Sequence, residues 1–82
     1  MILSKYDLIP EDSQVILTYR SEYDEQAGLF NTLEEAEQKA IEIVSEQFEE
    51  VETIDQLREL EKHSFFAVDF YKAEVGKMGK QI

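Results

Sequence analysis

Residues 32–52 read TLEEAEQKAIEIVSEQFEEVE, and the pattern of this stretch decides the expected fold. Thr32 and Glu35 have the spacing of a capping box, in which the threonine oxygen accepts the backbone N–H of the glutamate and the glutamate side chain reaches back. A helix is therefore expected to begin at Leu33. Apolar residues then recur at the spacing of one helical face, so the helix is predicted to pack on a core. These residues are Leu33, Ala36, Ala40, Ile41, Val44, Phe48 and Val51.

A second, shorter helix is expected after the first, with only a kink between them near residues 51–53. Thr53 and Gln56 repeat the spacing of a helix cap. The helix is predicted to end near Lys62 and His63, because positive charge suits a helix C-terminus. Its apolar face consists of Ile54, Leu57 and Leu60.

A β-hairpin is expected before the helices. Residues 14–20, QVILTYR, are rich in β-branched and aromatic side chains, which favour a strand. The polar residues that follow lead to Gly28, and we predict a hairpin loop around residues 24–28 in which this glycine supplies a positive φ. Leu29 and Phe30 then pair back as a short second strand.

The run SFFAVDFYK, residues 64–72, has the strongest strand pattern in the chain. Phe66, Val68 and Phe70 alternate to one side of it, as the period of a strand requires. The expected fold class is therefore α+β: a small antiparallel sheet of about three strands with two helices packed on one face, in the order β-β-α-α-β.

One compact domain is expected over residues 1–74, because a chain of 82 residues supplies a single hydrophobic core. Residues 75–82, VGKMGKQI, contain two of the three glycines and show no periodicity, so we predict a flexible C-terminal tail. Residues 1–12 fit either an edge strand or a loop over the core, and we favour a partly extended segment.

The negative charge is concentrated in one part of the sequence. The net charge is −11, yet residues 22–61 hold fourteen acids and two bases, while the rest of the chain holds five acids and six bases. Such asymmetry disfavours binding to nucleic acid or to an anionic membrane, and it favours a protein partner with a basic surface. The alternative is that the acidity serves only solubility.

The sequence offers no catalytic motif. Cysteine is absent and His63 is the only histidine, which excludes thiolate chemistry and disfavours a nucleophilic triad. Glu59 and His63 have i, i+4 spacing, but two ligands from one helix are weak support for a metal site. In the window 24–35, Gly28 occupies position 5 instead of position 6 of a calcium-binding loop. No enzymatic activity, cofactor or metal is therefore predicted.

A cytoplasmic location is expected. Lys5, Asp7 and Pro10 interrupt the apolar run that a signal peptide requires, and no run approaches the ~18 apolar residues of a membrane helix. The absence of cysteine agrees with a reducing compartment.

The first helix is expected to carry most of the negative charge. Residues 34–52 contain eight glutamates and Lys39. As one helix of about 28 Å they would present one net negative charge per about 4 Å, close to the ~3.4 Å charge spacing along one strand of nucleic acid. The helix dipole accounts for the glutamates of the first turn, whereas the line from Glu42 to Glu50 has no such explanation.

In size, acidity and lack of a catalytic motif the chain resembles the small acidic anti-CRISPR and anti-restriction proteins of phages and mobile elements, which mimic DNA. The resemblance covers the general character of the whole chain and no sequence motif. It implies an inhibitor that docks on a basic, nucleic-acid-binding site of a partner protein and blocks it, without binding nucleic acid itself. The residues expected to make this contact are Glu22, Asp24, Glu25, Glu35, Glu42, Glu46, Glu49 and Glu50.

Two other classes of function are kept as alternatives. A small structural or accessory subunit would assemble through sheet edges or apolar surface, with the acidity serving only solubility. An enzyme would use carboxylates together with a divalent ion. The chain itself is expected to be a monomer or a weak homodimer.

Overall fold

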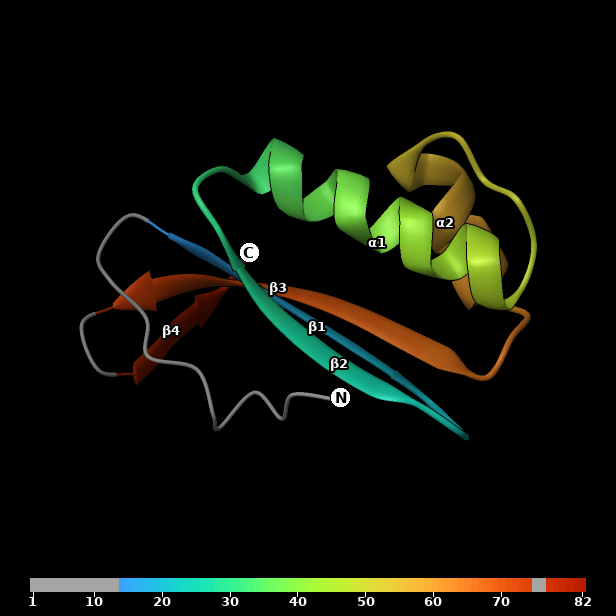
Figure 1. Cartoon of the computed structure of the whole chain (residues 1–82), viewed down its shortest axis with the longest axis horizontal. Coiled ribbons are helices and arrows are strands. Elements are labelled where there is room, and N and C mark those ends of the chain that lie inside the picture. The colour runs from blue at the N-terminus through green and yellow to red at the C-terminus, as the bar shows by residue number, and fades with distance from the viewer. Residues whose placement is uncertain (1–13, 75–76) are drawn as a thin grey trace.

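Four antiparallel strands form one sheet, and two helices lie across one of its faces (Figure 1). The structure is a computed structural model that describes residues 14–74 and 77–82. The strands are ordered β2-β1-β3-β4 across the sheet, so β1 and β3 occupy the centre. The elements are β1 (Val15–Ser21), β2 (Glu25–Phe30), α1 (Leu33–Gln47), α2 (Ile54–Glu61), β3 (Phe66–Glu74) and β4 (Lys77–Gln81).

The predicted α+β class, with an antiparallel sheet and two helices, is confirmed. The sheet has one strand more than predicted. This strand is β4, which pairs with β3 and which the prediction of a tail over residues 75–82 omits. An edge strand needs no continuous apolar face, so its sequence carries little periodic signal. The partly extended segment favoured for residues 1–12 lies outside the described residues.

The β1–β2 hairpin turns earlier in the chain than predicted. The Ser21 N–H donates to the Asp24 carbonyl oxygen over 2.8 Å, and the Asp24 N–H donates to Ser21 Oγ over 3.2 Å. These bonds close a tight turn at residues 22–24. Gly28 therefore lies inside β2, opposite Leu17 of β1 and without a positive φ. The prediction that Gly28 makes the turn is wrong, because the hydrogen bonds between Ser21 and Asp24 close the turn before the chain reaches Gly28.

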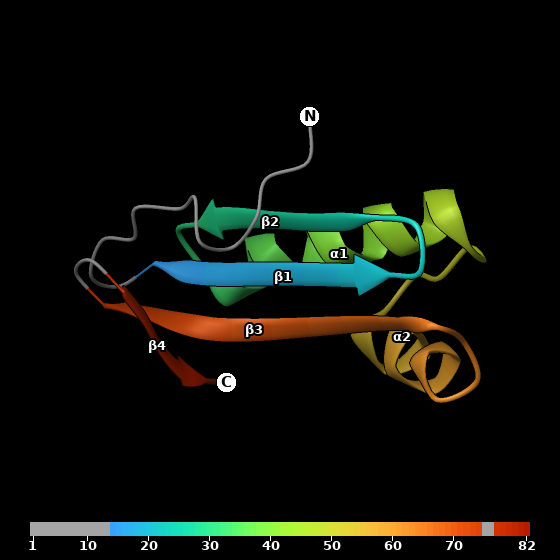
Figure 2. The ribbon, with the colours of Figure 1, turned by 90° about the horizontal axis from the view of Figure 1, so that it is seen from below.

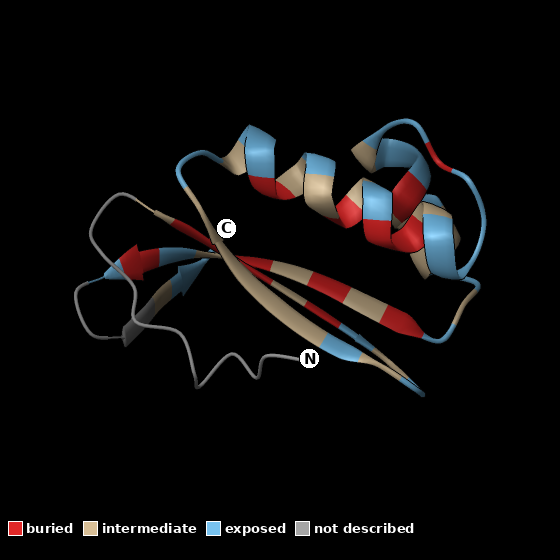
Figure 3. Ribbon diagram, in the orientation of Figure 1, coloured by how far each residue is buried: buried red, intermediate tan, exposed pale blue. Residues whose placement is uncertain are grey.

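The core lies between the sheet and the helices. Figure 3 shows buried residues on the strands beneath the helices and on the helix sides that face the sheet. Phe66, Val68 and Phe70 are buried there, as predicted. Burial of a large apolar side chain contributes about 1.5–3 kcal/mol, so this layer dominates the stability. The core residues are Val15, Leu17, Tyr19, Ala36, Ala40, Ile43, Val44, Val51, Leu57, Phe66, Val68 and Phe70.

Both predicted helix caps are present. Thr32 Oγ1 accepts the Glu35 N–H over 3.1 Å, and Thr53 Oγ1 accepts the Gln56 N–H over 3.1 Å. Each threonine thereby satisfies one of the N–H groups that a helix start leaves without an intrahelical partner.

The first helix ends earlier than predicted, at Gln47. After it the chain folds back so that Val51 is buried against the core. Ser45 Oγ holds this return, because it accepts the Val51 N–H and donates to the Val51 carbonyl, each over 3.2 Å. Glu49 and Glu50, predicted to extend the helix, therefore lie in the loop of residues 48–53 between α1 and α2.

An ion pair on α2, between Arg58 and Glu61, satisfies backbone groups of β3 in the part of the strand that does not pair with β4. The Val68 N–H donates to Glu61 Oε2 over 2.8 Å, and Arg58 Nη1 donates to the Val68 carbonyl over 2.6 Å. Arg58 also pairs with Glu61 over 3.0 Å. Val68 is fully buried, so its backbone groups need such partners. The pair docks α2 on β3 and blocks this edge against pairing with another chain.

Glu61→Ala is expected to lower the free energy of unfolding by about 1–3 kcal/mol, because it leaves the buried Val68 N–H without an acceptor and Arg58 without its carboxylate. Urea denaturation measures the loss. The matched control is Glu59→Ala, which removes an exposed carboxylate and is expected to change stability by less than about 0.5 kcal/mol. Equal losses in the two variants would contradict the role given to Glu61.

Gly79 allows β4 to lie close to β3. The pairing shifts between Tyr71 and Ala73, which marks a bulge in β3. A Cβ on Gly79 would collide with the backbone oxygen of Lys72, inside this bulge. The backbone of one strand would have to move to make room. At Gly28, in contrast, the nearest atom to an added Cβ is Cε2 of the Phe30 ring, 3.0 Å away.

Gly79→Ala is therefore expected to lower the free energy of unfolding by about 1–3 kcal/mol, since the overlap is with backbone. Gly28→Ala serves as the matched control and is expected to cost less, because a ring can rotate away. Thermal denaturation compares the two variants. A Gly79→Ala protein that melts at or above the temperature of the Gly28→Ala protein would show that β4 does not pack as described.

Candidate interaction surface at the acidic end

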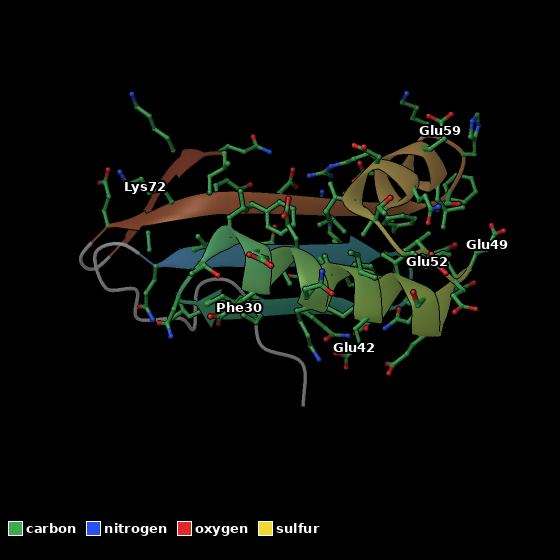
Figure 4. All side chains as sticks on the ribbon, turned by 90° about the horizontal axis from the view of Figure 1, so that it is seen from above. Phe30, Glu42, Glu49, Glu52, Glu59 and Lys72 are labelled. Carbon is green, nitrogen blue, oxygen red and sulfur yellow. The ribbon has the colours of Figure 1, made fainter. Side chains whose placement is uncertain are left out.

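Acidic side chains gather at the end of the molecule that holds the β1–β2 turn, the last turn of α1 and the loop of residues 48–53. In Figure 4, Glu49 lies just beyond the last turn of α1 and Glu52 lies between α1 and α2. All of these side chains are exposed except Asp24, which is half-buried. We call this region the acidic end. It consists of Glu22, Asp24, Glu25, Glu46, Glu49, Glu50 and Glu52.

Gln47 ties the β1–β2 turn to the end of α1. The Tyr19 hydroxyl donates to Gln47 Oε1 over 2.8 Å, and Gln47 Nε2 donates to Asp24 Oδ2 over 2.6 Å. Asp24 Oδ2 also accepts Gln26 Nε2 over 2.7 Å. Tyr19 has no exposed surface, so its hydroxyl requires a partner inside the protein. This chain of hydrogen bonds holds the acids of the hairpin close to Glu46.

The same hydrogen bonds stabilise the charged form of Asp24. Donation from Gln26, followed by donation from Gln47, lowers the pKa of the Asp24 carboxyl below its ordinary value. Burial raises the pKa of the Tyr19 phenol, which keeps it protonated as the donor to Gln47. Asp24, predicted as a partner contact, thus also has a structural role.

The ion pairs between described residues do not include the acids of the acidic end. Within residues 14–74 and 77–82, none of its six glutamates has a cationic partner within ion-pair distance. Arg20 is the nearest cation in sequence, and it lies opposite Glu25 in the β1–β2 ladder. The ion pairs present are Lys39–Glu42, Arg58–Glu61, Lys62–Glu59 and, at 3.8 Å, His63–Glu59.

Two predicted contact residues, Glu35 and Glu42, lie on α1 before its last turn. Figure 4 shows Glu42 midway along the helix. Lys39 Nζ is 3.2 Å from its Oε1, so the charge of Glu42 is offset. Glu35 belongs to the first turn of α1, where a negative charge suits the helix dipole. Both side chains are exposed, but neither belongs to the acidic end.

Helix α1 carries less charge per unit length than predicted. Its 15 residues span about 22 Å and contain five glutamates and Lys39, or one net negative charge per about 5–6 Å. The predicted match to the charge spacing of nucleic acid along one straight helix is therefore wrong. The charge is instead concentrated where the helix ends and the chain turns.

The opposite end of the molecule carries charges of both signs, because the glutamates that start α1 lie at the same end of the sheet as the lysines of β3 and β4. Figure 4 places Lys72 at the end of β3 that is farthest from Glu49. Lys80 lies on β4, which pairs with the same end of β3. The acidic end is therefore the more strongly negative of the two ends, and it favours the approach of a basic partner from that side.

A surface hollow of about 390 Å³ lies between the loop of residues 48–53 and α2. Glu49, Glu50 and Glu59 line it, together with His63. Nowhere in the described part of the chain are three or more His, Asp or Glu residues placed to hold a metal ion. The hollow adds carboxylate surface beside the acidic end.

Sequence reasoning did not identify Gln47, the residue that organises this surface. Its partner Asp24 is 23 positions away, so no local pattern connects the two. Glu52 was omitted for a different reason. On a continuous helix nothing would distinguish Glu52 from the other glutamates, whereas in the observed loop it belongs to the same acidic group as Glu49 and Glu50.

Comparison with known protein families, with curated proteins and with solved structures finds no match for this chain. Among the residues that the structure describes, no helix has the length and apolar character needed to cross a membrane.

Asp24→Asn is expected to reduce stability in a pH-dependent manner. Because the pKa of Asp24 is lowered in the folded state, its carboxylate stabilises the fold above its ordinary pKa of about 3.9, and this contribution is lost as the pH falls through the lowered value. Urea denaturation from pH 7 to pH 2 should show a gap between wild type and variant that closes in acid. In a Gln47→Ala background the gap should be smaller. A gap independent of pH would refute the hydrogen-bonded carboxylate.

Proposed function

We propose that this chain is a non-enzymatic binding protein that docks its acidic end on a basic, nucleic-acid-binding surface of a partner protein and blocks that surface. The observation that carries the proposal is the group of six exposed glutamates without an ion pair among the described residues. Their mutual repulsion opposes folding, and cationic side chains of a partner would relieve it.

The chemistry of the surface supports a protein partner. Carboxylates accept hydrogen bonds from lysine and arginine in the same way as phosphates do, so a groove that binds a phosphate backbone also suits clustered glutamates. In this mode of action the chain would be similar to the anti-CRISPR and anti-restriction proteins that mimic DNA. Direct binding to nucleic acid or to an anionic membrane is opposed by the net charge of −11.

The gathering of glutamates without an ion pair among the described residues at one end supports a defined orientation of docking. A basic partner is attracted most strongly to the acidic end, because the far end of the molecule mixes the lysines of β3 and β4 with the glutamates that start α1. Screening acts over about 8 Å at physiological ionic strength, so affinity should fall as salt is added.

Charge reversal at the acidic end tests the proposal. The immobilised chain is used to capture basic proteins from a nuclease-treated extract of the native host, and the captured partner is purified. Fluorescence anisotropy of a labelled duplex then measures whether the chain displaces nucleic acid from that partner. Wild type should displace it at low salt, while Glu46→Lys with Glu49→Lys should weaken displacement by about tenfold or more.

The matched control is Glu34→Lys with Glu37→Lys, which makes the same change in net charge at the other end of α1. It should displace nucleic acid nearly as well as wild type, provided circular dichroism shows that it is folded. Displacement that is insensitive to salt, or equal losses in the two double variants, would count against the proposal.

An accessory subunit that assembles through a sheet edge is the second candidate. The edge strand β2 favours it, because residues 26–30 carry no charge and an uncharged edge can pair with another strand. Light scattering distinguishes the two. Self-association that persists in high salt would support assembly through β2, and Ala27→Lys should then abolish it.

A further inference from the structure

Two aromatic side chains at the acidic end take no part in the core. Tyr23 is 90% exposed and Phe65 is 84% exposed. The β1–β2 turn and the start of β3 lie at the same end of the sheet (Figure 2). Ser21 pairs with Phe66 across β1 and β3, so Glu22 and Phe65 follow directly after the last pair of that ladder. The fold gives neither ring a packing role, because both stand in solvent.

An open hollow of about 670 Å³ lies between these strand ends. Phe65 and Glu22 line it from opposite sides, with Arg20, Ser64 and Ala67 around them. Side chains alternate along a strand, and Phe66 is buried beneath the helices. Phe65 directly precedes β3 and lines the hollow together with Arg20 and Ala67, which alternate with the buried Tyr19 and Phe66, so it is on the side of the sheet away from the helices.

The turn that carries Tyr23 is fixed at both ends. Ser21 and Asp24 are joined by three hydrogen bonds, and the Asp24 side chain accepts from Gln26 and Gln47. A ring presented on a fixed turn loses little conformational freedom when it binds. Such rigid, exposed aromatic residues are typical anchors of protein interfaces.

The charge around the hollow favours one kind of side chain as the group that binds there. Among the residues that the structure describes, Arg20 is the one cation that lines the hollow, and Glu25 lies opposite it in the β1–β2 ladder. With Glu22 and Asp24 added, this region is net negative.

A guanidinium stacks on aromatic rings and forms paired hydrogen bonds with a carboxylate, and the arginine stem is apolar. Lysine presents a compact, strongly hydrated charge instead. A second copy of this chain is disfavoured, because each copy carries a net charge of −11.

We propose that Tyr23, Phe65 and Glu22 form an arginine-binding site through which the chain grips an arginine side chain of its basic partner. The proposal rests on the proposed function and deepens it by naming the group that is recognised. In this arrangement the arginine stem lies over Phe65, the guanidinium meets the ring of Tyr23, and Glu22 accepts its N–H groups.

NMR titration of the ¹⁵N-labelled chain with the peptide acetyl-Arg-Gly-Arg-amide tests the site, and the lysine analogue of the peptide is the comparison. The arginine peptide should shift the resonances of Glu22, Tyr23 and Phe65 and should bind several-fold more tightly than the lysine peptide. Tyr23→Ser with Phe65→Ser should weaken arginine binding by about threefold to tenfold. The matched control is Ile82→Ser, which removes an apolar residue that is 57% exposed outside the site and should leave binding unchanged.

The outcomes separate this site from the proposed function. Equal affinity for the two peptides, or shifts confined to residues 46–52, would overturn the arginine site while leaving the acidic end intact as a docking surface. Absence of peptide binding to a chain that still displaces nucleic acid from its captured partner would do the same. Arginine-selective shifts at Tyr23 and Phe65 in a chain that displaces no nucleic acid would support the site and overturn the proposed function.

Discussion

The hydroxyl of Tyr19 is the polar group on which the arrangement of the acidic end depends. Tyr19 is fully buried between the sheet and α1, so its hydroxyl must find a partner inside the protein. Gln47 supplies that partner and also donates to Asp24. One buried tyrosine thereby positions the last turn of α1 over the β1–β2 turn, and the loop of residues 48–53 starts from this fixed point.

The distribution of charge follows from that constraint. Helix α1 stops at Gln47. The glutamates that follow therefore lie in the loop where the chain turns and not along the helix; they are Glu49, Glu50 and Glu52. The hairpin adds its own acids below them, while Lys72 lies at the opposite end of the sheet (Figure 4). Solubility requires net charge but not its concentration at one end. A concentrated field does serve the orientation of a basic partner.

The parts of the fold that were predictable depend on neighbours in the sequence. The caps at Thr32 and Thr53 join residues three positions apart, and the alternation that buries Phe66 is a property of one strand. The end of α1, strand β4 and the early turn of the hairpin depend on tertiary contacts. For the site, the acidic residues themselves were predictable, but their division between α1 and the acidic end follows from Gln47 and its distant partners.

Hydrogen exchange of the chain, measured alone and in complex with its captured basic partner, tests most directly whether the acidic end is the docking surface. The partner should slow exchange in residues 21–26 and 46–52 and at Phe65, with little change in β4. Slowed exchange confined to the edge strands β2 and β4, with residues 46–52 unchanged, would contradict docking through the acidic end and would show that the chain assembles through its sheet.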